Sequence, residues 1–170
     1  MKLIILGAGG YGRTVADIAR QSGRYTEVCF LDDNSTDEMV IGKCAGYINY
    51  ITSDTELYPA FGNNEGRLRW IERLVIAGAN IPTLIHHTAY VSPEATIGVG
   101  TMVLPKAIIN TGVVVNTGCI INCGAIIDHG CVIENGVHIC LGAIVKAENR
   151  IPKCMKVEAG TVIENRTYPV

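Results

Sequence analysis

The chain has 170 residues and a net charge of −2, with 14 basic side chains against 16 acidic ones. This balance offers no electrostatic attraction for nucleic acid or for an anionic membrane surface, so neither is expected as a partner. No apolar run is long enough to cross a bilayer, and Met1 and Lys2 lead directly into a strand-like LIIL segment rather than into a signal peptide. We therefore expect a cytoplasmic protein.

The seven cysteines are an odd number and include no Cys-x-x-Cys spacing. A zinc site needs a tighter cluster of ligands, so no metal is expected. Unpaired thiols are typical of a reducing compartment, which agrees with a cytoplasmic location.

The first segment has the pattern of strand, glycine loop, helix, strand and acid. A strand at residues 3–6 is followed by GAGGYG at 7–12 and by helical apolar spacing, and a second strand at 28–31 ends in Asp32 and Asp33. In the G-x-G-x-x-G pattern the loop lets a diphosphate approach backbone N–H groups at a helix N-terminus, and the acid accepts hydrogen bonds from a ribose or sugar hydroxyl. The alternative is that the glycines only allow close packing of strand against helix.

Residues 1–85 are enough for one βαβαβ half of a dinucleotide-binding fold, which has two such halves. We predict an α/β half-Rossmann domain here, and its size favours a mononucleotide or a nucleotide-sugar over a dinucleotide. Within it we expect a short strand at 47–51, a strand at 57–61 and a helix at 65–77.

The segment Gly62-Asn63-Asn64 follows the last of these strands. We therefore expect it at a carboxyl end of the sheet, beside the glycine loop, where open α/β sheets bind ligands. An asparagine at this point can equally serve as the N-cap of the following helix, and the two roles are compatible.

From Val91 to Ile163 an aliphatic residue returns at every sixth position, thirteen times in succession. Glycine often follows three places later, and a small residue often stands two places before. Neither a helix nor an ordinary strand has this period, whereas each hexad of a parallel β-helix is one short strand and a corner. The aliphatic residue points inward, and glycine allows the positive φ of a corner. We predict a parallel β-helix over residues 86–170, with Cys119 and Cys131 in its core.

Residues with catalytic potential gather in one part of the repeats, at Asn122, His129 and His138. An imidazole is the usual base near neutral pH. With three hexads in each coil the chain returns to the same face after eighteen residues, so a spacing of nine puts the two histidines on different faces. They can still meet between chains packed around a symmetry axis. His86 and His87, which precede the repeats, are interpreted as ordinary solvated histidines.

The order of motifs between residues 3 and 147 resembles that of a known family. The motifs are the glycine loop, LDD, GNNEGR, LIH, and hexads containing I-D-H and H-I. They resemble the bacterial nucleotide-sugar acetyltransferases of the hexapeptide-repeat superfamily, in the branch of sialic-acid O-acetyltransferases and UDP-4-amino-sugar N-acetyltransferases. The resemblance implies a left-handed β-helix, a homotrimer, and acetyl-CoA bound between neighbouring chains. It also implies direct acetyl transfer to an amino or hydroxyl group of a sugar, without a metal.

The resemblance further implies roles for individual residues. His129 is the expected general base, and the main-chain amide of Ala147 is expected to hold the thioester oxygen. His138 and Ala159 are expected to contact acetyl-CoA. The nucleotide-sugar is expected to bind glycines, acids and amides of both domains: Gly9, Gly10, Tyr11, Asp32, Asp33, Gly62, Asn63 and Asn122.

Two positions depart from the family pattern. Relatives usually carry Glu or Asp directly after the base, where it orients the imidazole, and this chain has Gly130. Asp128 precedes the base, but neighbouring strand residues point to opposite sides, so we do not expect it to substitute. Ala147 replaces a frequent glycine, a change that keeps the backbone N–H.

Two other classes of function therefore stay open. Gly130 is compatible with a non-catalytic protein that binds a nucleotide-sugar or CoA. A metal-dependent enzyme on the same fold, such as a carbonic anhydrase, would need three histidines converging between chains.

Overall fold

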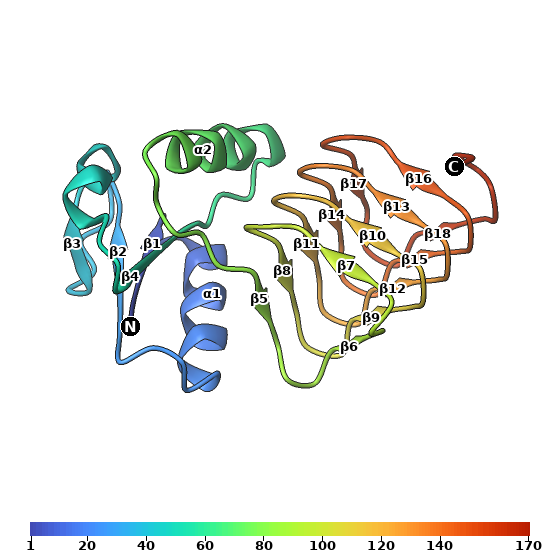
Figure 1. Ribbon diagram of the computed structural model, residues 1–170, viewed down its shortest axis with the longest axis horizontal. Helices are drawn as coiled ribbons and strands as arrows, with labels where there is room; N and C mark the ends of the chain where they lie inside the picture. The colour runs from blue at the N-terminus through green and yellow to red at the C-terminus, as the bar shows by residue number, and fades with distance from the viewer. The chain divides into compact units, whose positions relative to one another are not determined.

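The computed structural model describes all 170 residues, and the chain divides into two compact units, Met1–Pro82 and Thr83–Val170. The first unit is a parallel sheet with helices, and the second is a coil of short parallel strands (Figure 1). The predicted fold class, an α/β domain followed by a β-helix of hexapeptide repeats, is confirmed. No helix of the structure combines the length and the apolar character that crossing a bilayer requires.

The first unit contains a four-stranded sheet in the order β3-β2-β1-β4, with every pair of neighbours parallel. The central strand β1 has four consecutive buried residues, as a parallel strand covered on both faces requires. The elements in chain order are β1 (Lys2–Leu6), α1 (Gly10–Gln21), β2 (Glu27–Leu31), β3 (Val40–Gly42), the 3₁₀ helix η1 (Cys44–Tyr50), β4 (Thr55–Pro59) and α2 (Asn64–Ile76).

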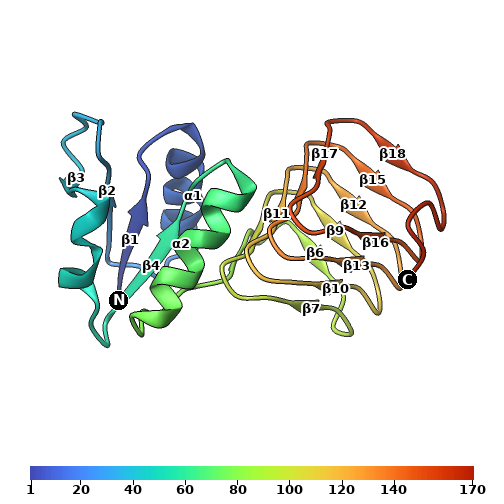
Figure 2. The ribbon, with the colours of Figure 1, turned by 90° about the horizontal axis from the view of Figure 1, so that it is seen from above.

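The two faces of this sheet are covered by different helices (Figure 2). Helix α1 packs closely enough that a Cβ on Gly12 would lie 3.7 Å from the Phe30 ring. On the other face, Leu31 of β2 belongs to an apolar cluster with residues of η1 and with Leu74 of α2. The sheet is therefore enclosed, and its carboxyl edge remains for polar loops.

The segment between β2 and β4 differs from the prediction. The expected strand at 47–51 is wrong, because residues 44–50 form the 3₁₀ helix η1. Tyr47 and Tyr50 lie three residues apart, so one face of this helix puts both rings against the sheet core. Strand β4 begins two residues before the predicted start, and helix α2 begins one residue before it.

The second unit is built from strands of two residues each. They lie on three faces, and each strand pairs in parallel with the strand eighteen residues along, as Val114 pairs with Val132. Face 1 consists of β5 (Leu84–Ile85), β8 (Met102–Val103), β11 (Ile120–Ile121), β14 (His138–Ile139) and β17 (Lys156–Val157). Face 2 consists of β6 (Tyr90–Val91), β9 (Ile108–Ile109), β12 (Ile126–Ile127), β15 (Ile144–Val145) and β18 (Val162–Ile163). Face 3 consists of β7 (Thr96–Ile97), β10 (Val114–Val115), β13 (Val132–Ile133) and β16 (Arg150–Ile151).

A corner follows every strand, and from residue 100 to residue 166 every sixth residue has a positive φ. Glycine occupies eight of these positions, as the hexad pattern predicts. The other four are Lys106, Glu148, Cys154 and Arg166, with φ between 54° and 59°. Each corner thus requires one residue in the left-handed conformation, and this residue is usually but not always glycine.

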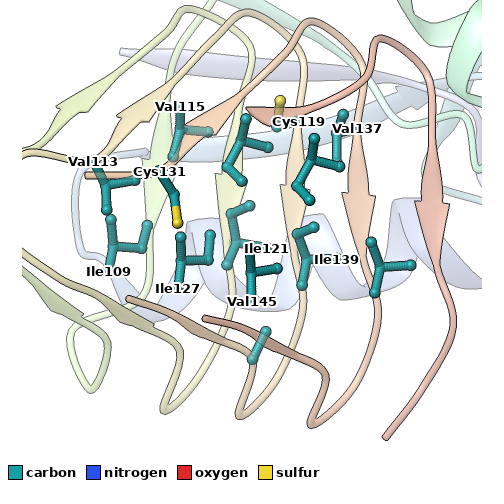
Figure 3. Close-up of a cluster of buried hydrophobic side chains, with 14 of the residues drawn as sticks. Ile109, Val113, Val115, Cys119, Ile121, Ile127, Cys131, Val137, Ile139 and Val145 are labelled. Atoms are coloured by element: carbon teal, nitrogen blue, oxygen red, sulfur yellow. The ribbon is translucent and has the colours of Figure 1, made fainter. Parts of the chain in front are cut away.

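From β6 onward the second residue of each strand points into the coil, where it stacks on its counterpart in the next turn (Figure 3). Ile127, Ile133 and Ile139 are completely buried. Cys119 and Cys131 fill the smaller inward positions, as predicted, and their thiols donate to the carbonyl oxygens of Glu134 and Lys146. The core therefore consists of aliphatic side chains and small thiols.

The β-helix begins before residue 86. Leu84 and Ile85 form β5 and pair with Met102 and Val103, so they belong to face 1. Ile85 stands six residues before Val91, which extends the aliphatic period by one hexad.

Adjacent valines of β10 provide a test of this packing. Val115→Ala should lower the free energy of unfolding by about 2 kcal/mol, because two buried methyl groups are lost and a cavity remains. Val114→Ala removes the same groups from a side chain that is 38% exposed, so a much smaller loss is expected. Chemical denaturation of both variants measures the difference, and equal losses would contradict the inward–outward assignment.

Candidate functional site

The glycine loop between β1 and α1 contains two kinds of glycine. Gly7 has a φ of 103°, and a Cβ added to Gly12 would lie 1.9 Å from the Gly7 carbonyl oxygen. These two glycines are therefore required by the packing of strand against helix, as the alternative interpretation of the loop proposed. Gly9 and Gly10 are exposed, and a Cβ on either would meet no atom within 4 Å. Their open surface is available to a ligand.

The N-terminus of α1 leaves backbone donors available beside these glycines. Its N-cap is Gly9, which has no side chain to accept from the first turn. No acidic residue lies in that turn, so the positive end of the helix dipole is not neutralised locally. This end of the helix suits an anionic group such as a phosphate.

Asp32 and Asp33, at the carboxyl end of β2, are both held by the backbone. Asp32 Oδ2 accepts the Ala8 N–H at 2.8 Å, and Oδ1 accepts N–H bonds from Asn34 and Ser35. These N–H donors, that of Ala8 first, hold the pKa of the Asp32 carboxyl below its ordinary value. Asp33 is exposed, and only its Oδ1 is engaged, by the Cys44 N–H at 3.0 Å. Asp33 thus has the freer carboxylate.

Tyr11 turns its hydroxyl inward, to a hydrogen bond of 2.9 Å with the hydroxyl of Tyr58. Burial raises the pKa of Tyr11 to about 12, so the phenol is neutral at physiological pH. A ligand at this loop therefore meets the backbone of Tyr11 rather than its hydroxyl.

The loop after β4 lies beside the glycine loop, because β4 and β1 are neighbours in the sheet. Gly62 is exposed and has open space around its α-carbon. Asn63 is the N-cap of α2, and its side chain accepts the Gly66 N–H at 2.7 Å. The structure thus shows the capping role of Asn63, and the expected position of this segment at the carboxyl edge is confirmed.

Sequence reasoning missed Arg67, which is completely buried. Its guanidinium donates to the Phe61 carbonyl and to the Asn64 side chain, both at 2.9 Å. The nearby positive charge also opposes part of the rise in the pKa of Tyr11. The available signal was its spacing, since Arg67 occupies the apolar stripe of α2 with Ile71 and Leu74.

In the β-helix, His129 stands at the edge between face 2 and face 3. It is exposed, and its imidazole makes no hydrogen bond or ion pair within the chain. Asp128 does not orient the ring, because its Oδ1 accepts the backbone N–H of His129 at 2.7 Å and the side-chain amide of Asn110 at 3.2 Å. The expectation that Asp128 does not substitute for an orienting carboxylate agrees with these contacts.

Ala147 lies one coil after His129 on the same edge. At the equivalent places, the N–H groups of Thr111 and His129 donate to the preceding Asn110 and Asp128 side chains. The residue before Ala147 is Lys146, whose side chain contains no hydrogen-bond acceptor. The backbone N–H of Ala147 makes no hydrogen bond in the chain. A cavity of about 240 Å³ is lined by His129, Ala147, Glu148, Asn165 and Arg166. An imidazole and an unused backbone N–H donor therefore share one cavity.

The remaining predicted residues lie elsewhere on the coil. Asn122 Nδ2 and His138 Nε2 are 3.1 Å apart, where face 1 meets face 2. Ala159 is exposed on this same edge. His129 and His138 are therefore on different faces of one chain, as their spacing predicts.

The other two histidines both have contacts within the chain. His86 is not solvated as predicted but buried, and its Nδ1 lies 2.9 Å from the Thr88 hydroxyl. His87 is exposed and lies against the His86 ring at 4.2 Å between centroids. The structure contains no group of three or more His, Cys, Asp or Glu side chains that could hold a metal ion.

Comparisons with known proteins agree with this architecture. Residues 2–74 match the family model of the PglD N-terminal domain. The acetyltransferase domain of PglB from Neisseria gonorrhoeae FA1090 is 34% identical, over 97% of this chain and 83% of that one, with a TM-score of 0.92. The chain belongs to the PglD-type sugar N-acetyltransferase family. The same Neisseria domain in complex with acetyl coenzyme A matches this PglD-type chain with 35% identity, a TM-score of 0.91, and coverage of 97% and 82%.

Two further relatives of this PglD-type chain are more distant or match in part. The UDP-N-acetylbacillosamine N-acetyltransferase of Bacillus subtilis (strain 168) is 34% identical over 109 residues, 59% of this chain. The match spans half the length of that relative. A perosamine N-acetyltransferase from Caulobacter crescentus, solved as a mutant with CoA and GDP-perosamine, is 20% identical over 97% of this chain and 89% of its own. Its TM-score of 0.82 shows a shared fold.

The two kinds of glycine in the loop predict opposite effects of the same substitution. Gly12→Ala should cost about 3 kcal/mol or more of stability, or prevent folding, because its methyl group would overlap the Gly7 carbonyl. Gly9→Ala should cost less than about 1 kcal/mol, since the new methyl group meets only solvent. Thermal unfolding of the two variants distinguishes them, and a strongly destabilised Gly9→Ala would show that Gly9 has a packing role.

Proposed function

We propose that the chain transfers an acetyl group from acetyl-CoA to the amino group of a nucleotide-linked sugar, with His129 as the general base. The observation that carries this proposal is the cavity shared by the partnerless His129 imidazole and the unused N–H of Ala147. The named activity of the Bacillus relative and the acetyl coenzyme A complex of the Neisseria domain support the choice of substrates.

In this reaction the two groups have separate tasks. His129 takes the proton from the sugar amine as the nitrogen attacks the thioester carbon. The Ala147 N–H donates to the oxygen that becomes negative in the tetrahedral intermediate, which collapses with CoA thiolate as the leaving group. A preorganised donor at this point lowers the barrier because it needs no reorganisation during the reaction.

A covalent intermediate on cysteine is not part of the proposal. Burial raises the pKa of the Cys131 thiol and that of Cys140, which disfavours the nucleophilic thiolate. No cysteine lines the cavity of His129. Direct transfer therefore fits the residues present.

For the nucleotide-sugar we propose the carboxyl edge of the first unit. The diphosphate lies over Gly9 and Gly10 at the N-terminus of α1, where open backbone and the helix dipole favour an anion. Asp33 is exposed and has a carboxylate oxygen without a partner, so it accepts from a ribose or sugar hydroxyl. Asp32 positions this loop through its three backbone contacts.

We further propose that the complete site forms between chains of a homotrimer. The outward residues of face 2 form an apolar column: Tyr90, Ile108, Ile126, Ile144 and Val162. Tyr90, Ile108 and Val162 are exposed, and Ile126 and Ile144 are half-buried. Packing these columns around a threefold axis brings the two edges of face 2 together between neighbouring chains. One edge carries His129 and Ala147, and the other carries Asn122 and Ala159 with His138 beside it. Residues that are apart in one chain thus meet.

A non-catalytic binding protein is the second candidate, and Gly130 is the observation that favours it. The residue after the base has no carboxylate, so the ring lacks the orienting group expected of the family. Binding of a UDP-sugar without turnover of any amino-sugar acceptor would support this candidate.

The general-base assignment predicts a large kinetic loss. His129→Ala should lower kcat by about 10²–10⁴-fold, the usual contribution of a positioned base. The measurement is mass-spectrometric detection of a product heavier by one acetyl group, after incubation with acetyl-CoA and a panel of UDP-amino-sugars. Full activity in the variant would refute the role of His129, and its unchanged thermal unfolding is the control for folding.

The shared site predicts complementation between two damaged chains. His129→Ala and His138→Ala should each be impaired alone, because each removes one edge from every site. Co-expressed and randomly mixed, they should recover up to about a quarter of the wild-type activity, since some sites then combine two intact edges. Activity no higher than that of the separate variants would mean that the histidines do not act across chains.

A further inference from the structure

We propose that Glu148 is the positioning carboxylate of His129, supplied from the next coil at the point where Gly130 has no side chain. The inference rests on the proposed function, because it assigns a partner to the general base of that reaction. It also gives the PglD-type chain a route to catalysis despite its glycine at position 130.

The need for such a partner follows from imidazole chemistry. A neutral histidine acts as a base through one ring nitrogen, and a hydrogen bond from the other nitrogen sets the tautomer and the ring orientation. Within the chain the His129 ring makes no such bond, and Asp128 is engaged by Asn110 and by the His129 backbone. A carboxylate on the neighbouring coil could supply the bond that Asp128 does not make.

Glu148 lies directly above Gly130, eighteen residues along the coil. Its backbone N–H donates to the His129 carbonyl oxygen at 3.1 Å, which ties the two levels together. A Cβ built on Gly130 would lie 3.7 Å from the Glu148 Cγ and would touch nothing else within 4 Å. The Glu148 side chain thus passes over the space where a side chain of residue 130 would begin.

The carboxylate of Glu148 has one oxygen fixed and one available. Arg166, a further coil along, donates its Nε–H to Glu148 Oε2 at 2.5 Å. Oε1 has no hydrogen-bond partner in the chain. Glu148 is also the one carboxylate that lines the cavity with His129. The geometry fits a relay in which Arg166 holds Glu148, and Glu148 Oε1 accepts the ring N–H of His129.

The other charged groups at this edge are already committed. Lys146 pairs with Glu164 at 2.5 Å on the neighbouring column, and Asp128 accepts two N–H bonds. Arg166 is the remaining cation, and it is paired with Glu148. Asp128 does not line the cavity of His129, whereas Glu148 does.

Positions 130 and 148 are equivalent corner positions on neighbouring coils. Glu148 has a φ of 58° and Gly130 a φ of 66°, so both residues adopt the same left-handed conformation. Gly130→Glu therefore introduces the same left-handed strain that Glu148 already bears, and it would place a carboxylate on the residue directly after the base. This substitution provides a rescue test.

The kinetic experiment compares four variants by the product assay described above. Glu148→Gln should lower kcat by about 10–100-fold with little change in KM for acetyl-CoA, the usual effect of removing a group that orients a functional histidine. Adding Gly130→Glu to Glu148→Gln should restore most of the loss. Glu134→Gln is the matched control, since Glu134 also pairs with an arginine, Arg150, but at the edge of face 3 and face 1. His129→Ala reports on the base itself.

A second readout does not depend on turnover. In ¹⁵N-labelled protein, the ring-nitrogen shifts of His129 should indicate one dominant tautomer, and Glu148→Gln should give a mixture at the same pH. Two results would overturn the proposal. In the first, Glu148→Gln keeps the wild-type kcat and the wild-type tautomer. In the second, Glu148→Gln loses activity but keeps the wild-type tautomer, and adding Gly130→Glu does not restore the activity. Full activity in His129→Ala would instead overturn the proposed function, and the tautomer measurement would still decide whether Glu148 contacts the ring.

Discussion

The second unit depends on a conformational constraint that returns at every corner. The backbone must enter the left-handed φ region once in each hexad, and twelve successive corners satisfy this requirement between residues 100 and 166. For most residues the conformation is costly, so glycine is frequent there. Where the corner residue is not glycine, the backbone hydrogen bonds to the next coil and the stacked aliphatic core hold it in place. The regular coil, with its eighteen-residue ladder, follows from this repeated turn.

The ladder converts sequence spacing into columns of neighbours along each edge. Along one edge the column runs through Thr111, His129, Ala147 and Asn165, and its members differ although their backbones are equivalent. An acceptor side chain before Thr111 and His129 satisfies their N–H groups, and a lysine before Ala147 does not. An unused N–H donor thus arises from a single change in a repeating hydrogen-bond pattern, with no distortion of the fold.

The sequence was most informative where a physical requirement repeats. The inward aliphatic period, the corner glycines and the buried Cys119 and Cys131 were all predicted, because each hexad meets the same steric environment. The glycine loop was predicted as a whole, but its division into packing and open positions depends on the distance from Gly12 to the Gly7 carbonyl. That distance has no signature in a G-x-G-x-x-G pattern.

Other features depended on contacts that spacing alone does not specify. The 3₁₀ helix η1 replaces a predicted strand because Tyr47 and Tyr50 pack on the sheet. Arg67 can be buried because its guanidinium donates hydrogen bonds to neutral acceptors. His86 is buried with Thr88 as its partner, although a histidine before the repeats gives no reason to expect this. Glu148 was overlooked because its relation to His129 spans a coil, and a motif search compares neighbours in sequence.

The coil also limits how such a chain can change in length. Each edge is defined by counting eighteen residues, so inserting or deleting one hexad would rotate every later residue to the next face. The amide of Ala147 would then leave the edge of His129 even though every hexad still folded. Whole coils can be gained or lost beyond a site, and extra residues can leave the coil as loops at a corner. The unit can therefore change in length by whole turns outside the segment 129–147, whereas within that segment a change of one hexad would separate His129 from Ala147.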